Sequence, residues 1–75
     1  MGLMAMIRGP RPSELLSSRP DYSIEINPVM RGFRLRLWFS IVGDRMFVER
    51  MFPETMDYEA ALDEVAVEVL KILNS

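Results

Sequence analysis

The sequence predicts an α+β domain: a short N-terminal helix, a three-stranded antiparallel meander, and a C-terminal amphipathic helix packed on one sheet face. Three patterns carry this prediction. Residues 33–52 alternate in polarity as a β-hairpin does, and residues 22–27 form a shorter alternating segment before it. Residues 58–73 repeat apolar side chains with helical period. Since the chain has only 75 residues, we expect a small core, which oligomerisation often supplements.

Residues 1–12 are predicted to be an N-terminal arm and linker, and residues 13–75 a single domain. The Met1–Ile7 segment is apolar but short and follows no basic residue, so we expect neither a signal peptide nor a membrane span. It either folds back on the surface, which we favour, or acts as an arm or edge strand for a partner. The prolines and glycine of Arg8–Pro12 predict a linker.

A short helix is predicted over residues 13–18. Ser13 is the expected N-cap, and Glu14 lies in the first turn, where the helix dipole favours a carboxylate. Leu15 and Leu16 are expected to attach this helix to the core.

Residues 22–27 then predict a half-buried strand, followed by a loop over residues 28–32. In the following hairpin Gly43-Asp44 is the expected turn, because glycine accepts a positive φ and aspartate tolerates it. This turn sets the expected cross-strand pairs, which are Val42–Arg45, Ile41–Met46 and Phe39–Val48.

The alternation divides the hairpin into two faces. The expected core face contains Phe33, Leu35, Leu37, Phe39, Ile41, Met46, Val48 and Phe52, with Arg50 as a charged exception. The expected second face contains Arg34, Arg36, Trp38, Val42, Phe47, Glu49 and Met51. The parity of the third strand stays open, because a one-residue bulge would exchange its two faces.

The closing helix is predicted to begin after Pro53, with Thr55 or Asp57 as its N-cap. Its apolar stripe is Tyr58, Ala61, Leu62, Val65, Ala66, Val69, Leu70, Ile72 and Leu73. We expect this stripe to cover the core face of the hairpin, and Asn74 to close the helix.

Several of these positions together resemble the double-stranded RNA-binding domain, over about residues 13–73. They are Pro20, Tyr22, Phe33, the Gly43-Asp44 hairpin, Ala61, Ala66, Leu70 and Leu73. The resemblance implies RNA contacts from the first helix, the first inter-strand loop and a lysine cluster opening the last helix. That loop offers only Arg31 and Gly32 here.

Acids stand where the resemblance implies lysines, at Glu54, Asp57 and Glu59. They would repel phosphate, whose neutralisation supplies most of the affinity for a nucleic-acid backbone. The resemblance therefore implies a degenerate member that binds protein, often through its strand side.

Catalytic chemistry has little support in the composition. The chain has no cysteine and no histidine, so it lacks thiolate chemistry and the commonest acid–base group. The carboxylate pairs Glu59/Asp63 and Glu64/Glu68 are expected to form a solvated helix face rather than a metal site. We therefore expect no enzyme activity, no cofactor and no metal, and a cytoplasmic location, since lack of cysteine suits a reducing compartment.

One group of residues does indicate a function, namely the arginines and aromatic residues of the second hairpin face. Arg and Trp are residues of protein-binding hot spots, and the scarcity of lysine and net charge of −2 favour a protein over nucleic acid. The predicted partner-binding residues are Arg34, Arg36, Trp38, Arg45, Phe47, Glu49 and Met51.

The sequence thus predicts a non-enzymatic protein-binding module, acting through the outer sheet face or an edge strand as a homodimer. An inhibitor, an antitoxin-like protein or an accessory protein of a microbe or virus fits its size. The alternative is RNA binding through Arg31, Arg34, Arg36 and Trp38. A third hypothesis is a structural subunit whose Glu64 and Glu68 meet a basic partner.

Overall fold

The computed structural model describes residues 10–75, so the predicted arm at Met1–Ile7 lies outside the described residues. The elements are α2 (Pro12–Ser17), β1 (Ser23–Val29), β2 (Gly32–Ile41), β3 (Asp44–Pro53) and α3 (Tyr58–Leu73). The predicted α+β class and element order are confirmed.

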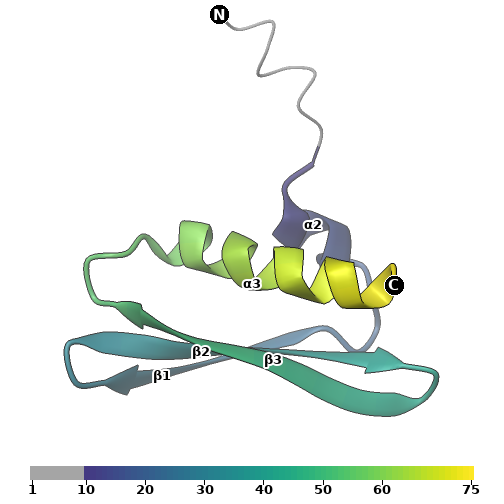
Figure 1. Cartoon of the computed structure of the whole chain (residues 1–75), viewed down its shortest axis with the longest axis horizontal. Coiled ribbons are helices and arrows are strands. Elements are labelled where there is room, and N and C mark those ends of the chain that lie inside the picture. Colours follow the sequence, from purple (N-terminus) through teal and green to yellow (C-terminus); the bar gives the residue numbers. More distant parts are fainter. Residues whose placement is uncertain (1–9) are drawn as a thin grey trace, which may run out of the picture.

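The strands form one antiparallel sheet in the order β1-β2-β3, and both helices lie on the same side of it (Figure 1). Helix α3 packs on β2 and β3, and α2 packs on α3. The buried core is Leu16, Leu35, Leu37, Phe39, Phe52, Ala61, Leu62, Val65, Ala66 and Val69. The opposite side of the sheet, which we call the outer face, is covered by no element within residues 10–75.

The β2–β3 turn lies one residue earlier than predicted, at Val42-Gly43. Both residues have positive φ, 49° and 84°, as the two central residues of a type I′ turn require. The predicted pairs are wrong, and the observed ones are Ser40–Arg45, Phe39–Met46 and Leu37–Val48. A type I′ turn matches the twist of the strands, which outweighs the poor fit of a β-branched residue to positive φ.

The two predicted faces of the hairpin are unchanged by this correction. Moving the turn by one residue shifts each cross-strand partner by two residues, so each side chain stays on the same side of the sheet. Leu35, Leu37 and Phe39 are at most 1% exposed beneath α3. The exception is Val42, which lies in the turn at 96% exposure and belongs to neither face. The parity of the third strand, which the sequence left open, is the one without a bulge in its pairing to β2.

Strand β1 is longer than predicted and extends through Pro28 to Val29, so the predicted five-residue loop is wrong. The connecting turn is only Met30-Arg31, with Arg31 at φ 62°. Pro28 is tolerated because β1 is an edge strand, where a missing N–H can face away from the ladder. Gly32 after the turn is required by space, since an added Cβ would lie 2.1 Å from the Phe52 carbonyl oxygen.

Helix α2 begins at Pro12, so the linker prediction is wrong at that residue and Ser13 is not the N-cap. Arg11 occupies the cap position, and its backbone N–H donates to Glu14 Oε1 at 3.1 Å. Proline suits the first helical position, because its missing N–H would have no intrahelical partner there. Leu16 is fully buried as predicted, whereas the other expected anchor, Leu15, is 50% exposed.

Helix α3 follows the prediction closely. Asp57 is the N-cap, and its Oδ2 accepts the Ala60 N–H at 3.1 Å. The buried side of the helix matches the predicted stripe, while Tyr58 at its start is 40% exposed. No helix within the described residues is long and apolar enough to span a membrane.

Candidate functional site

The sheet registers bring the predicted partner-binding residues together on the outer face. Strand β1 contributes Ser23, Glu25 and Asn27, strand β2 contributes Arg34, Arg36, Trp38 and Ser40, and strand β3 contributes Arg45, Phe47, Glu49 and Met51. Alternate side chains of a strand point to opposite sides, so all of these lie away from α3. Arg31, predicted for the nucleic-acid alternative, lies apart from them in the β1–β2 turn.

An aromatic pair forms the centre of this face. Trp38 and Phe47 are direct cross-strand neighbours, and their ring centroids are 4.8 Å apart at an interplanar angle of 58°. The Arg36 guanidinium carbon lies 4.4 Å from the Phe47 centroid and 5.8 Å from that of Trp38. Arg45 lies 5.0 Å from the Trp38 centroid. Such cation–π contacts fix the arginines and rings relative to one another.

Two arginines of β2, Arg36 and Arg34, lie beside acids of the neighbouring strands. Arg36 Nε and Nη2 donate to Glu49 Oε1 at 2.9 and 2.7 Å, and its Nη1 lies 3.7 Å from Glu25 Oε1. Arg34 Nε lies 3.8 Å from the same Glu49 oxygen, too far for a hydrogen bond, and this buried nitrogen has no hydrogen-bond partner. The positive charge of this face is thus largely compensated within the chain.

Glu25 connects the acids to the aromatic centre. Its Oε1 accepts the Trp38 indole N–H at 3.1 Å, and its Oε2 accepts the Asn27 amide at 3.0 Å. The pKa of Glu25 is lowered from its ordinary value, chiefly by the Trp38 hydrogen bond and then by that of Asn27, which outweigh partial desolvation. The indole is therefore oriented by a carboxylate that stays charged at neutral pH.

Arg45 reaches over Trp38 towards β1. Its Nη2 donates to Ser23 Oγ at 3.1 Å, and its Nη1 donates to the Asp21 carbonyl oxygen at 3.4 Å. Phe47 remains 45% exposed and Met51 65% exposed. The outer face therefore combines ordered charged groups with apolar surface that still contacts solvent.

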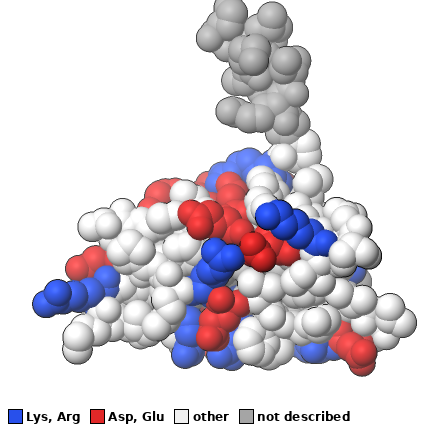
Figure 2. Space-filling model, viewed as in Figure 1, with Lys and Arg blue, Asp and Glu red and all other residues white. Residues whose placement is uncertain are grey.

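Charges of both signs also lie close together elsewhere. On the side of the molecule drawn in Figure 2, Lys and Arg side chains lie beside Asp and Glu side chains rather than forming a separate basic area. One such pair joins Arg50 of β3 to Glu68 of α3 at 3.2 Å. The helix carboxylate Glu68, predicted to be solvated, is thus partly compensated by the sheet.

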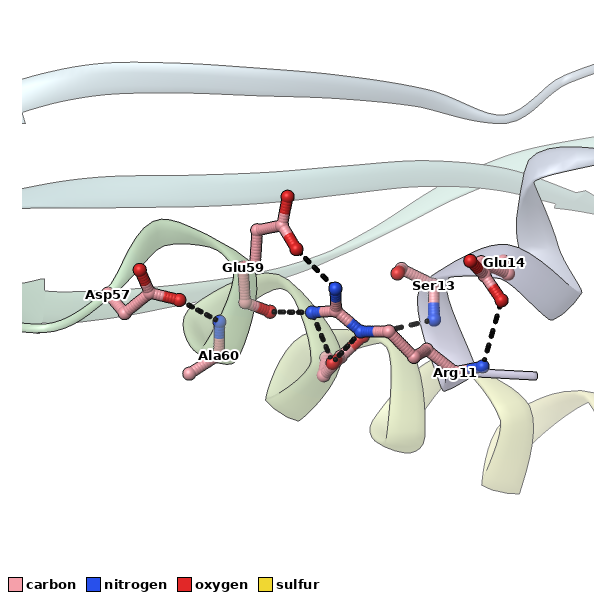
Figure 3. A network of polar contacts seen from close by, with 7 residues as sticks. Arg11, Ser13, Glu14, Asp57, Glu59 and Ala60 are labelled. Carbon is pink, nitrogen blue, oxygen red and sulfur yellow. Dashed lines mark hydrogen bonds and ion pairs between the residues drawn. The ribbon is translucent and has the colours of Figure 1, made fainter. Parts of the chain in front are cut away.

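A second polar cluster joins the two helices, and the sequence analysis missed it (Figure 3). Arg11 Nε and Nη2 donate to Asp63 Oδ2 at 2.9 and 2.7 Å, its Nη1 pairs with the Glu59 carboxylate, and its Nη2 also donates to the Glu59 carbonyl. The Ser13 backbone N–H donates to Asp63 Oδ1 at 3.3 Å. The sequence predicts a linker at Arg11, and no local pattern signals a partner so distant in the sequence.

This cluster changes the interpretation of the Glu59/Asp63 pair. Partial burial raises the pKa of Asp63, but the hydrogen bonds from Arg11 and Ser13 outweigh it, so the net shift is downwards. The same two carboxylates raise the pKa of Arg11. The pair thus serves to attach α2 to α3. Within residues 10–75 no group of three or more potential metal-ligating side chains comes together.

Comparison with known proteins finds no matching family model, no matching curated protein and no matching solved structure. The resemblance to the double-stranded RNA-binding domain stays a prediction, and function must be argued from the geometry of the outer face.

Proposed function

We propose that the chain is a non-enzymatic protein-binding module, which acts through its outer face and the adjoining edge of β3 and works as a homodimer. The observation that carries this proposal is the Trp38–Phe47 pair, which lies against the guanidinium groups of Arg36 and Arg45. The charge of Arg36 is already paired with Glu25 and Glu49. A surface of this kind offers apolar area to a partner protein. The partner does not have to be strongly acidic, because the charge of Arg36 is already compensated.

The order of the outer face supports binding energetically. Trp38 and Arg36 are each held by more than one contact, so little side-chain freedom remains to be lost when a partner docks. Aromatic and arginine side chains are also the residues that most often dominate protein interfaces. Phe47 and Met51 supply exposed apolar surface beside them.

A homodimer fits the size of the core and the distribution of exposed apolar residues. The core contains few large side chains, and small domains of this kind gain stability by association. Three exposed apolar residues, Met46 at 39%, Phe47 at 45% and Met51 at 65%, lie on the edge strand β3. A symmetric contact along this edge would bring Met46 on the core side, and Phe47 and Met51 on the outer side, against the second copy.

Trp38 is the only tryptophan, so its fluorescence reports this face alone. We expect its protection from acrylamide to rise with protein concentration, in step with a doubling of the mass measured by light scattering. Phe47→Ala should move this transition to higher concentration, whereas Leu15→Ala, at a similarly exposed apolar residue on α2, should not. A constant one-chain mass with quenching of Trp38 that does not change with concentration would contradict the homodimer.

RNA binding remains the second candidate, because two arginine side chains donate no hydrogen bond among the described residues. The exposed Arg31 side chain makes no hydrogen bond or ion pair there, and the Arg34 side chain is 33% exposed. This candidate predicts salt-dependent binding that Arg36→Glu abolishes. Arg19→Glu should leave this binding unchanged, because the Arg19 side chain donates to the Ser40 carbonyl near the end of β2 that is distant from Arg31 and Arg34. No shift of duplex or single-stranded probes at low salt would exclude it.

A further inference from the structure

Within residues 10–75, the edge of β3 that faces away from β2 offers a regular row of backbone groups without a partner strand. Ile41 and Asp44 close a two-residue turn, and such a closing pair is hydrogen-bonded. Even-numbered residues of β3 therefore bond to β2, and the backbone groups of Arg45, Phe47 and Glu49 point away from the sheet. This edge is a template for another strand.

The two edges of the sheet differ in how they are protected. Strand β1 has 7 residues and is interrupted by Pro28, one of the devices that block edge pairing. Strand β3 has 10 residues, pairs with β2 without a bulge, and has its single proline at the last position, Pro53. No proline interrupts its middle, so the protection of this edge rests on charged side chains such as Arg45 and Glu49.

We propose that two copies of the chain pair antiparallel through β3, with a twofold axis at Phe47, so that the two sheets become one. This rests on the proposed homodimer and specifies its contact. The facing pairs are Phe47 with Phe47, Met46 with Val48, Arg45 with Glu49 and Asp44 with Arg50 of the second copy. Cross-strand pairs of this kind, apolar with apolar and acid with base, stabilise a sheet.

Neighbouring registers lack this complementarity. An axis at Glu49 or at Arg45 sets two like charges directly against each other, which destabilises a sheet. An axis at Val48 sets Phe47 against Glu49, and an axis at Met46 sets Arg45 against Phe47. Only the axis at Phe47 pairs opposite charges on both sides of this strand.

The proposed register also continues the rows already present on the outer face. Glu25, Arg36 and Glu49 alternate in sign across β1, β2 and β3, and Arg45 of the second copy continues the alternation. Similarly, the Trp38–Phe47 pair of one copy meets that of the other across the axis. The existing order of the outer face therefore extends through the contact.

The side chains have bonding capacity left for this contact. Glu49 binds Arg36 through Oε1, and within the described residues its Oε2 accepts no hydrogen bond, so it can accept from Arg45 of the second copy. Arg45 exchanges its exposed bond to Ser23 for this one. Asp44 has no side-chain partner within residues 10–75 and meets Arg50, which Glu68 already holds in place.

Charge reversal tests the register directly. Arg45→Glu alone or Glu49→Arg alone places like charges at both symmetric positions, so each variant should dimerise at least ten times more weakly than the wild type. Mixing the two variants restores an acid–base pair at both positions. We therefore expect the equimolar mixture to form a 1:1 heterodimer, resolved from either homodimer by native mass spectrometry.

A second pair of variants covers the case in which Glu49→Arg fails to fold after losing Arg36, as circular dichroism would reveal. Asp44→Arg mixed with Arg50→Asp tests the same register on the other side of the strand. Selective heterodimer formation in either mixture supports the inference. A wild-type dimer that Arg45→Glu does not weaken overturns this register but leaves the proposed homodimer standing, whereas a wild-type monomer overturns both.

Discussion

The two faces of the sheet are made by alternate residues of the same strands, yet they are held in different ways. On the core face Leu35, Leu37 and Phe39 are at most 1% exposed beneath α3. On the outer face the intervening Arg36 and Trp38 are ordered by ion pairs, a hydrogen bond and ring contacts. Successive residues of a single strand thus alternate between side chains buried in the core and side chains ordered on the surface by polar and ring contacts.

The physical consequence is that the two faces should respond differently to substitution. Burial of apolar area is the main stabilising term in folding, whereas partly exposed ion pairs contribute little each. Changes on the outer face should therefore alter association more than stability.

The largest expected effect is on the core face. Leu37→Ala should lower the free energy of unfolding by about 2–5 kcal/mol, because it leaves a cavity under α3. Phe47→Ala, at a side chain already 45% exposed, should cost the monomer less than about 1 kcal/mol. Urea denaturation at a concentration below association measures both, and equal losses would contradict the division between the faces.

The next effect concerns the turn that joins β2 to β3. Val42 has φ 49° and is 96% exposed, so it carries backbone strain without contributing to the core. Val42→Asn should stabilise the fold by about 1 kcal/mol, since asparagine tolerates positive φ. Met30→Asn in the other turn, where φ is not positive, is the matched control and should change little. A loss of stability in Val42→Asn would show that the valine makes a contact after all.

A smaller effect is expected for contacts within the outer face. Arg36 lies 4.4 Å from the Phe47 ring centroid, which predicts a coupling of about 0.5–1 kcal/mol in a double-mutant cycle of the two alanine variants. The cycle of Arg19 with Phe47 should show no coupling. If Arg36 and Phe47 also proved additive, their stacking would not be what orders the face.

The smallest effect is the pH dependence of these polar contacts. Glu25 and Asp63 have folded-state pKa values below their ordinary values of 4.5 and 3.8. Their stabilisation is therefore fully present above those values and is lost as the pH falls through the folded-state pKa of each group. Glu25→Gln and Asp63→Asn should each flatten the acid limb of stability, measured by thermal melting from pH 6 to about 2. An unchanged acid limb in both variants would contradict these pairings.

Much of this molecule follows from the sequence, because both sheet faces and the buried stripe of α3 repeat with fixed periods. The strand period of two also predicted which residues of β2 and β3, between Arg34 and Met51, share the outer face. The position of the turn was not, since it depends on strand twist outweighing the strain at Val42. Pro28 was assigned to the loop because proline is depleted in strands, although the first strand of the predicted meander is an edge, where proline is tolerated.

The Arg11 cluster could not be predicted from the sequence for a different reason. Its acids, Glu59 and Asp63, lie on another helix far along the chain, and no periodicity connects them to Arg11. Composition likewise could not show that Arg36 and Glu49 are paired. This ion pair makes the outer face a charge-compensated surface instead of a basic one.

Sedimentation equilibrium of three chains tests the central claim most directly. The wild type should approach twice the chain mass of 8.7 kDa as concentration rises. Phe47→Glu, which places a charge at the centre of the outer face, should remain at one chain mass with its circular dichroism unchanged. Leu15→Glu, at a similarly exposed apolar residue of α2, should dimerise like the wild type. A wild type that stays at 8.7 kDa, or a Phe47→Glu variant that dimerises equally well, would contradict the account.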